Sequence, residues 1–404
     1  MVSYGIASFK DKKVLMLQGP VGPFFKRLGK DLEKVGAEVS KINLNGGDWF
    51  FSDKGAINFT GKPEEWGVFF ASFIKNQKID RLLLFGDCRE YHRIAHTLAH
   101  AQGIEIGVFE EGYVRPDYIT FERFGVNGFS LLPRNRAFYD QLNDDKVTIS
   151  PTISVGNSFY AMAWWAFLYY FFSALLFPMF RFYRHHRPLN PWEIMYWIRS
   201  FWRKQWYKVA ERTREQTLIT QESKNYFLVP LQISTDAQVC AHSPYHSVED
   251  FIHSVIASFA EKASNERILV IKHHPLDRGY HNYKTVITKV AFQYGIMQRC
   301  WYIHDQHLPT LLEHALGVVV INSTVGLSAL HHHVPLKVCG TAIYDMEGLT
   351  YQGSLDTFWD EAPLYAMDKE LFKIFRGYII NDKQINGNFY RRLEGIGTFS
   401  GLKW

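Results

Sequence analysis

Three short polar triplets in this sequence each follow an apolar, strand-like run. They are Glu110-Glu111-Gly112, His273-His274-Pro275 and Asn322-Ser323-Thr324. In an open α/β sheet, ligands bind at the carboxyl ends of the strands. A carboxylate pair, a histidine pair and a hydroxyl pair at such positions therefore predict one active site built from two parts of the chain.

The carboxylate pair offers the chemistry of a general base, or of a nucleophile at the anomeric carbon of a sugar. Because side chains alternate along a strand, we expect Glu110 and Glu111 to point in different directions, one into the site and one into supporting structure. Gly112 allows another backbone to approach closely. Taken alone, such a pair is also typical of surface or capping residues, since carboxylates are mostly exposed.

The other two triplets suit a phosphate group. The imidazole of His273 or His274 can donate to a phosphate oxygen or protonate a leaving group, and Pro275 restrains the turn. Ser323 or Thr324 can cap the helix that follows, or hold a phosphate together with the free N–H groups of that helix, and the two roles are compatible. No suitably spaced third ligand follows the histidines, so we expect neither a metal site nor a cofactor.

Strands and helices alternate before and after a central segment whose composition differs from the rest of the chain. In residues 1–150 we expect strands at 14–18, 37–44, 81–85 and 104–109, and in residues 222–345 at 226–232, 267–272, 301–304, 317–321 and 335–339. This alternation is typical of parallel, doubly wound sheets. The predicted fold class is α/β, with two Rossmann-like domains facing a cleft in a GT-B-like architecture. The predicted parts are 1–150, 151–221, 222–368, and a C-terminal helix and tail, 369–404, packing on the first domain.

The joining segment 151–221 is apolar and then basic. No charged residue occurs between Val147 and Phe180, and residues 160–180 reach the ~20-residue length of a membrane span. Residues 181–214 then alternate basic side chains with Trp192, Trp197, Trp202 and Trp206. A transmembrane helix would separate the two domains, so a helical hairpin lying on an anionic membrane surface is the favoured interpretation. A buried helix pair or an oligomer contact is the third interpretation.

Composition excludes several classes of protein. The chain has 404 residues, of which 47% are hydrophobic, so it is not disordered. The net charge of +5 accompanies no nucleic-acid-binding motif, so nucleic acid is not an expected partner. The cysteines are scattered, which indicates neither a zinc site nor disulfides but the reduced cysteines of a cytosolic protein. The N-terminus does not have the pattern of a signal peptide.

The triplets, in this order, resemble the motifs of bacterial glycosyltransferases that use CMP-activated acidic sugars. A longer set of stretches resembles the KpsS family of capsule polysaccharide biosynthesis and export proteins, over roughly residues 12–380. These stretches are LMLQGPVGPFF, NGGDWFF, FGDCREYH, FEEGYVRPDYIT, VIKHHPLDRG, INSTVGLSAL and GLTYQGSLDTFW.

The resemblance implies a retaining, metal-independent β-Kdo glycosyltransferase. It would move Kdo from CMP-β-Kdo to (lyso)phosphatidylglycerol and so initiate the poly-Kdo linker of a Gram-negative capsular polysaccharide. The implied location is peripheral, at the cytoplasmic face of the inner membrane. The implied partners are CMP-Kdo, a phosphatidylglycerol-type glycolipid acceptor, an anionic membrane surface and other capsule assembly and export proteins. The alternative is a non-catalytic export or scaffold protein that docks the precursor glycolipid to the transporter.

The resemblance also implies roles for individual residues. Related enzymes carry Glu-Asp-Gly at the first triplet, so Glu111 takes the nucleophile's position beside Glu110, with Asp87 as the reserve candidate. The first domain would bind the acceptor and carry these carboxylates, and the second would bind CMP-sugar. The residues implied to hold CMP are His273, His274, Pro275, Asn322, Ser323 and Thr324. Our own addition is Arg115, which we expect to meet the Kdo carboxylate because arginine suits planar, bidentate recognition.

Overall fold

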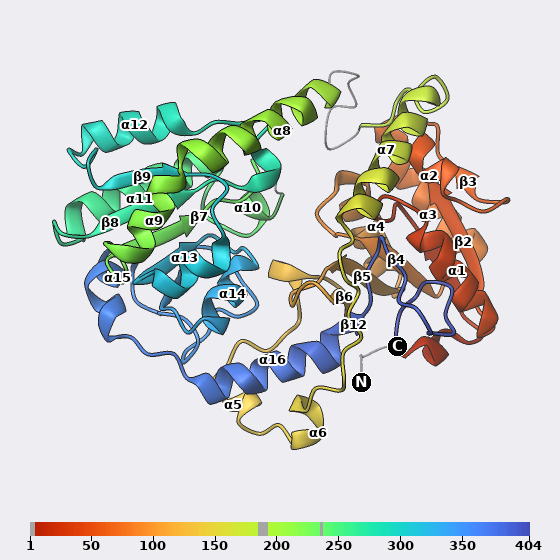
Figure 1. Ribbon diagram of the computed structural model, residues 1–404. Helices are drawn as coiled ribbons and strands as arrows, with labels where there is room; N and C mark the ends of the chain where they lie inside the picture. The colour runs from red at the N-terminus through yellow and green to blue at the C-terminus, as the bar shows by residue number, and fades with distance from the viewer. Residues whose placement is uncertain (1–4, 185–192, 235–236) are drawn as a thin grey trace. The chain divides into compact units, whose positions relative to one another are not determined.

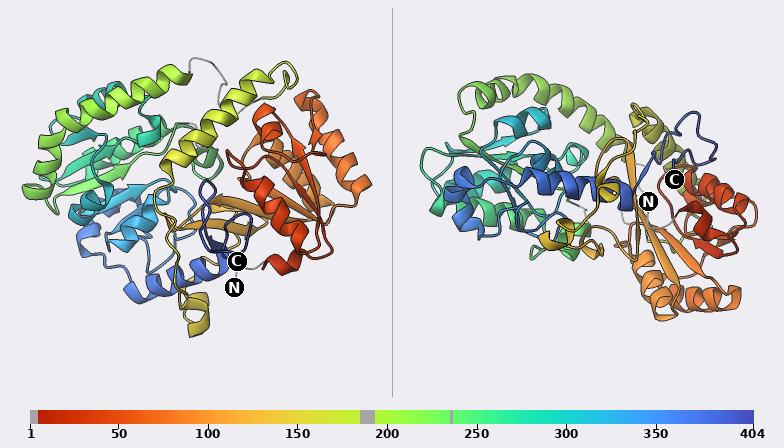
Figure 2. Two further views of the ribbon diagram at one scale, coloured as in Figure 1. Left: turned by 45° about the vertical axis from the view of Figure 1, so that its right-hand side comes forward. Right: turned by 90° about the horizontal axis from the view of Figure 1, so that it is seen from below.

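The computed structural model describes residues 5–184, 193–234 and 237–404 (Figure 1). The chain divides into two compact units. The first comprises Met1–Leu131, Leu142–Pro191 and Ile374–Trp404, and the second comprises Leu132–Gln141 and Trp192–Lys373. Each unit is built around its own sheet with helices packed on it, as two further views show (Figure 2). Two Rossmann-like units in one chain confirm the predicted α/β, GT-B-like fold class.

The first sheet has seven strands in the order β12-β6-β5-β4-β1-β2-β3. The parallel strands are β1 (Lys13–Met16), β2 (Glu38–Asn43), β3 (Ile57–Asn58), β4 (Arg81–Phe85) and β5 (Glu105–Glu111). Two antiparallel strands, β6 (Tyr118–Arg123) and β12 (Gln384–Asn386), extend the sheet beyond β5. The chain therefore turns back on itself at the carboxyl end of β5.

Both faces of this sheet are buried, which explains the unbroken apolar run of β4. Leu82 and Leu84 pack into one core, whereas Leu83 and Phe85 pack into the other. A strand covered on both sides needs apolar residues at every position. The helices of this unit are α1 (Phe24–Lys34), α2 (Gly46–Phe50), α3 (Trp66–Gln77), α4 (Glu90–Ala101), α6 (Asp144–Val147) and α7 (Phe159–Leu175).

The second sheet has five parallel strands in the order β11-β10-β7-β8-β9. They are β7 (Tyr226–Pro230), β8 (Ile268–Lys272), β9 (Cys300–Ile303), β10 (Gly317–Val320) and β11 (Leu336–Val338). The chain builds outwards from β7 to β9 and then returns to place β10 on the other side of β7. The carboxyl ends of β7 and β10 therefore flank the switch point at which such sheets bind ligands.

The helices of the second unit include one long helix, α8 (Glu193–Ala210), followed directly by α9 (Arg212–Thr220). The others are α5 (Arg136–Tyr139), α10 (Ala237–Ala241), α11 (Val248–Lys262), α12 (Lys284–Gln293), α13 (Leu308–His314), α14 (Val325–His331) and α15 (Leu355–Glu361). Helix α16 (Lys369–Lys383) carries the chain from the second unit into the first.

The units divide the chain differently from the predicted boundaries. Residues 151–221, expected as one insertion, are shared between them, because α7 packs on α2 in the first unit whereas Glu211, after α8, bonds to His304 in the second. Residues 374–404 belong to the first unit, where β12 pairs with β6. Trp192, part of the predicted basic-aromatic pattern, lies outside the described residues. Within the described ranges, none of the helices meets the length and hydropathy that a bilayer-spanning helix requires.

Candidate functional site

Glu110 and Glu111 are the last two residues of β5, not the first two after it as the sequence predicted. The reason is the antiparallel partner β6, which extends the strand by pairing Glu110 with Thr120 and Glu111 with Ile119. Gly112 then begins the turn between them. A Cβ atom on Gly112 would overlap the carbonyl oxygen of Tyr118, so the turn itself requires this glycine.

Glu110 is a half-buried carboxyl that is suited to exchange a proton. Its Oε1 accepts a hydrogen bond from the Glu111 N–H at 3.0 Å. Burial raises the pKa of Glu110 to about 7; the charges of Glu111 and Asp87 add to the rise, and Arg89 opposes it. A pKa near the working pH is the condition under which a carboxyl serves best as a general acid or base.

Glu111 has a different environment from its neighbour. Its Oε1 accepts a hydrogen bond of 2.8 Å from the hydroxyl of Tyr390, in the segment that follows β12. Burial, together with the charge of Glu111, raises the pKa of Tyr390 well above its ordinary value, so this hydroxyl stays protonated and donates. Sequence reasoning missed Tyr390, because 279 residues separate it from Glu111 and no local pattern marks it.

Asp87 and Arg115 lie on loops beside the carboxylate pair. Asp87 is buried; its Oδ2 accepts from the Val126 N–H at 2.9 Å and its Oδ1 from the thiol of Cys88 at 3.3 Å. These bonds give Asp87 a part in ordering the loop after β6. Arg115 is exposed on the β5–β6 turn, where its Nε donates to the Gly112 carbonyl at 3.0 Å.

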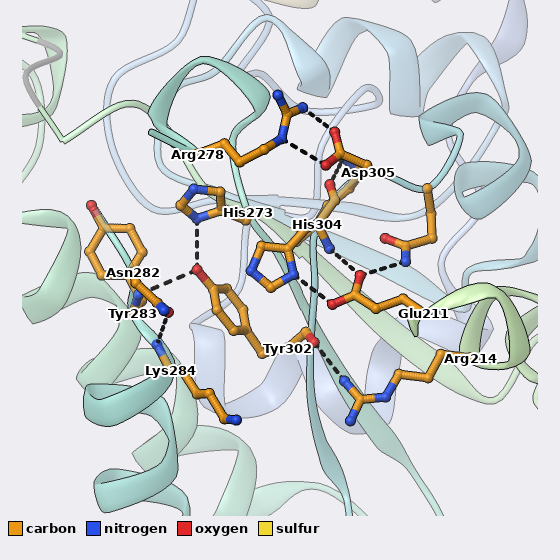
Figure 3. A network of polar contacts seen from close by, with 12 residues as sticks. Glu211, Arg214, His273, Arg278, Asn282, Tyr283, Lys284, Tyr302, His304 and Asp305 are labelled. Atoms are coloured by element: carbon orange, nitrogen blue, oxygen red, sulfur yellow. Dashed lines mark hydrogen bonds and ion pairs between the residues drawn. The ribbon is translucent and has the colours of Figure 1, made fainter. Parts of the chain in front are cut away.

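The two histidines of the second triplet point to different environments. His273 is buried, and its Nδ1 shares a hydrogen bond of 2.7 Å with the Tyr302 hydroxyl (Figure 3). Burial lowers the pKa of His273 to about 3, so the ring is neutral. His274 is half-buried, and its Nδ1 accepts from the Leu276 N–H at 3.2 Å, at the start of the short turn Pro275–Asp277.

A network of buried polar contacts holds the loop that contains this turn (Figure 3). Arg278 forms a two-pronged ion pair with Asp305, one arm of which is 2.7 Å long. Asp277 accepts hydrogen bonds from the N–H and the hydroxyl of Ser234, on the loop after β7. The loops after β7, β8 and β9 are therefore bound to one another, and His274 lies on the loop after β8 that these contacts hold.

The third triplet lies at the switch point of the second sheet. Gln232, just after β7, donates its side-chain amide to Asn322 Oδ1 at 3.0 Å, and the Asn322 N–H donates to Gln232 Oε1 at 3.3 Å. Ser323 Oγ accepts from the Val325 N–H at 3.2 Å. Thr324 is the N-cap residue of α14, but its side chain makes no capping bond. Gln232 was missed by sequence reasoning, although its position at a strand end was a usable signal.

The structure thus gathers most of the predicted residues, together with Gln232, into two groups, one in each unit. Glu110, Glu111 and Asp87 lie at the carboxyl ends of β4 and β5. The second group, at the carboxyl ends of β7, β8 and β10, comprises Gln232, His274, Asn322 and Ser323. His273 stands apart in the core of the second unit. Across the described part of the chain, no cluster of three His, Cys, Asp or Glu side chains could hold a metal ion.

Comparisons with known proteins identify close relatives. A family profile described as "Capsule polysaccharide biosynthesis protein" matches residues 80–390. The chain is 42% identical to the capsule polysaccharide export protein KpsS of Escherichia coli, over 94% of this chain and 97% of that protein. It is 38% identical to the capsule polysaccharide modification protein LipB of Neisseria meningitidis serogroup A, over 95% and 92% of the two chains. Among solved structures, Thermosulfurimonas dismutans KpsC, a β-Kdo 2,7 transferase, has 15% identity and a TM-score of 0.44, covering 93% and 92% of the two chains.

Proposed function

The chain belongs to the family of capsule polysaccharide biosynthesis proteins, and on this premise we propose that it is a retaining glycosyltransferase. Its donor is CMP-β-Kdo and its acceptor is phosphatidylglycerol or the lyso form, so that its product starts the linker of a capsular polysaccharide. The observation that carries the proposal is the pair at the end of β5, where one carboxyl has a pKa of about 7 and the next is held by a tyrosine hydroxyl.

Two successive displacements at the anomeric carbon retain its configuration, and this is the route we propose. In the first, a carboxylate oxygen of Glu111 bonds to this carbon while the bond from the carbon to the phosphate oxygen breaks, and CMP leaves with the electron pair. In the second, the acceptor hydroxyl oxygen bonds to the carbon and the ester to Glu111 breaks. The hydroxyl proton passes to ionised Glu110, whose pKa of about 7 suits this transfer.

CMP is proposed to bind in the second unit. The switch point between β7 and β10 is where doubly wound sheets bind nucleotides, and Asn322 and Ser323 lie there. His274 follows the neighbouring strand β8, on the same edge of the sheet. We assign the phosphate to His274, Ser323 and Thr324. Arg115 remains our proposed contact for the Kdo carboxylate.

The lipid acceptor is proposed to meet the protein near α7. Five exposed apolar side chains recur on this helix every three or four residues, and we call them the aromatic face: Tyr160, Trp164, Phe167, Phe171 and Leu175. Tyr169 and Ser173, by contrast, are buried. Aromatic rings favour the headgroup level of a membrane, and the exposed Arg181 and Arg184 that follow favour anionic lipid. We therefore propose that the protein binds a membrane peripherally; that this is the cytoplasmic face of the inner membrane is what the family resemblance implies.

The test is a transfer assay with purified protein, CMP-Kdo and a fluorescent phosphatidylglycerol. The wild type is expected to form a Kdo-lipid and release CMP. Glu111→Gln is expected to lower the rate by at least about 10³-fold while calorimetry shows unchanged affinity for CMP. His274→Ala is expected to weaken CMP binding about tenfold, the effect of one hydrogen bond to a charged group.

Two outcomes would contradict these assignments. A Glu111→Gln variant with near-normal turnover removes Glu111 from the mechanism. A wild-type protein that binds the fluorescent phosphatidylglycerol but transfers no Kdo overturns the proposed enzymatic activity and supports the scaffold alternative.

A further inference from the structure

We infer that Tyr390 is a positioning residue for Glu111, and that Trp165 of α7 holds Tyr390 in place. The inference rests on the proposed function, because it gives the Glu111 carboxylate a support that matters only if this carboxylate attacks the sugar. It connects the helix that bears the aromatic face with the reacting group.

The first contact orients the carboxylate. The Tyr390 hydroxyl donates to Glu111 Oε1 at 2.8 Å, and both side chains are half-buried. A hydrogen bond to a charged oxygen is stronger and more directional than one between neutral groups. A nucleophile must be held in the attacking geometry, since small misplacements lower the rate steeply.

The backbone around Tyr390 is itself held on several sides. Asn388 Oδ1 accepts from the N–H groups of Tyr390 at 2.9 Å and of Arg391 at 3.1 Å. The Phe389 ring packs edge-on against Phe24 and Phe85, with ring centroids 4.8 and 5.1 Å away. The placement of the hydroxyl is therefore set by the core of the first unit and not by the side chain alone.

Trp165 adds the contact from α7. Its indole Nε1 donates to the Tyr390 carbonyl at 3.0 Å. The indole meets Phe51 edge-on, at 5.8 Å between ring centroids. Gly22 has φ +108°, and a Cβ there would lie 3.0 Å from Trp165 Cβ, so the loop after β1 also closes on this side chain. Trp165 thus joins α7 to the segment that supports Glu111.

The main test is Tyr390→Phe, which removes the hydroxyl and keeps the ring. We expect kcat to fall about tenfold or more, the cost of a lost hydrogen bond to a charged group, with KM for CMP-Kdo and the melting temperature nearly unchanged. If Tyr390 only stabilised the fold, Tyr390→Phe would lower the melting temperature and would not lower kcat at an unchanged KM. The matched control is Tyr351→Phe in the second unit, which removes a hydroxyl that donates to Glu361 at 2.5 Å and should leave kcat unchanged. Unchanged kcat in Tyr390→Phe overturns the inference.

The role of Trp165 is tested by a double-mutant cycle. Trp165→Phe should lower kcat less than Tyr390→Phe does, again without a change in KM. If Trp165 acts through Tyr390, the double variant is no slower than Tyr390→Phe alone, because residues in one network do not add. Additive losses overturn the connection to α7.

An NMR experiment on the free protein, without substrate, tests this inference separately from the proposed function. With ¹³C-carboxyl-labelled glutamate, the Glu111 resonance can be assigned from the Glu111→Gln variant. Tyr390→Phe should move that resonance in the free protein, and a resonance that does not move overturns the contact. A wild type that transfers no Kdo overturns the proposed function, and the resonance then decides alone whether Tyr390 holds Glu111.

Discussion

Glu110 is a carboxyl whose burial favours its neutral form. Its pKa is about 7 in the folded protein against an ordinary value of 4.5, and desolvation is the largest cause. A group whose pKa is raised by folding stabilises the fold fully below its unfolded pKa, and this contribution is lost as pH rises through the folded pKa. The buried Glu122, with a pKa also raised to about 7 by burial, acts in the same direction. The first unit should therefore lose stability between about pH 4.5 and pH 8.

Glu110→Gln should remove part of this pH dependence. The rise in the pKa of Glu110 from 4.5 to about 7 corresponds to about 3 kcal/mol of free energy. Because the side chain is only half-buried, we expect a smaller effect: the variant should be more stable than the wild type by roughly 1–2 kcal/mol at pH 8.5. At pH 4.5 the difference should nearly vanish. Urea unfolding at the two pH values measures it. The control is Glu33→Gln, at an exposed position of α1. A difference between Glu110→Gln and wild type that does not change with pH contradicts the argument.

Helix α7 shows how an apolar segment can be built into a folded unit. The helix packs on α2 through a buried polar cluster in which Tyr169 donates to Asp48 Oδ1 at 3.0 Å and accepts from Gln18 at 2.8 Å. Two glycines of α2 allow this approach. A Cβ on Gly47 would lie 2.6 Å from the Tyr169 ring, and a Cβ on Gly46 would overlap the Phe172 carbonyl oxygen. Gly46 and Gly47 of the stretch NGGDWFF therefore form the surface on which α7 packs.

Gly46→Ala tests this contact. The obstructing atom is a backbone oxygen, so α7 or α2 must shift, and we expect a loss of about 2 kcal/mol or more in unfolding free energy. The matched control is Gly67→Ala in α3, where a Cβ would lie an ordinary 3.7 Å from its nearest neighbour and helix propensity favours alanine. Thermal unfolding of both variants measures the difference. Equal stability of the two would show that α7 does not depend on Gly46.

Local pattern was enough to predict some elements and not others. The bounds of β4 agree with the predicted strand 81–85, and β8 and β10 lie within the predicted ranges 267–272 and 317–321, because buried apolar runs are local signals. Strand β12 was missed because its partner β6 is distant in the sequence and was not itself predicted. Strand β6 was missed although it pairs with β5, a predicted strand that is its neighbour in the chain. The same physics explains the site. The triplets were visible as strand-end motifs, and Gln232 shares that signal, whereas Tyr390 is placed beside Glu111 by tertiary contacts that no local pattern encodes.

At the scale of the whole molecule, each unit carries a different part of the proposed chemistry. Each unit also has one helix with exposed aromatic side chains, α7 in the first and α8 in the second. The carboxylates belong to the first unit and the predicted phosphate ligands to the second. In addition to the aromatic face of α7, the helix α8 exposes Trp197, Phe201, Trp202 and Trp206. Exposed Lys204 and Lys208 lie among these rings. Such clustered apolar surface mixed with basic residues is typical of a protein that rests on anionic lipid.

Vesicle binding tests this attachment for both units. The wild type should sediment with phosphatidylglycerol vesicles at low salt, and less with phosphatidylcholine vesicles or at high salt, because surface charges are screened. Phe167→Ser/Phe171→Ser on α7 and Trp202→Ser/Trp206→Ser on α8 should each weaken binding about tenfold or more through lost apolar area. All four side chains are 47–70% exposed, so the variants should still fold.

Phe292→Ser, at a 76% exposed position of α12, is the control and should bind as the wild type does. A wild type that stays in solution overturns membrane attachment; if the same double variants then abolish self-association in sedimentation velocity, these faces form an oligomer contact instead.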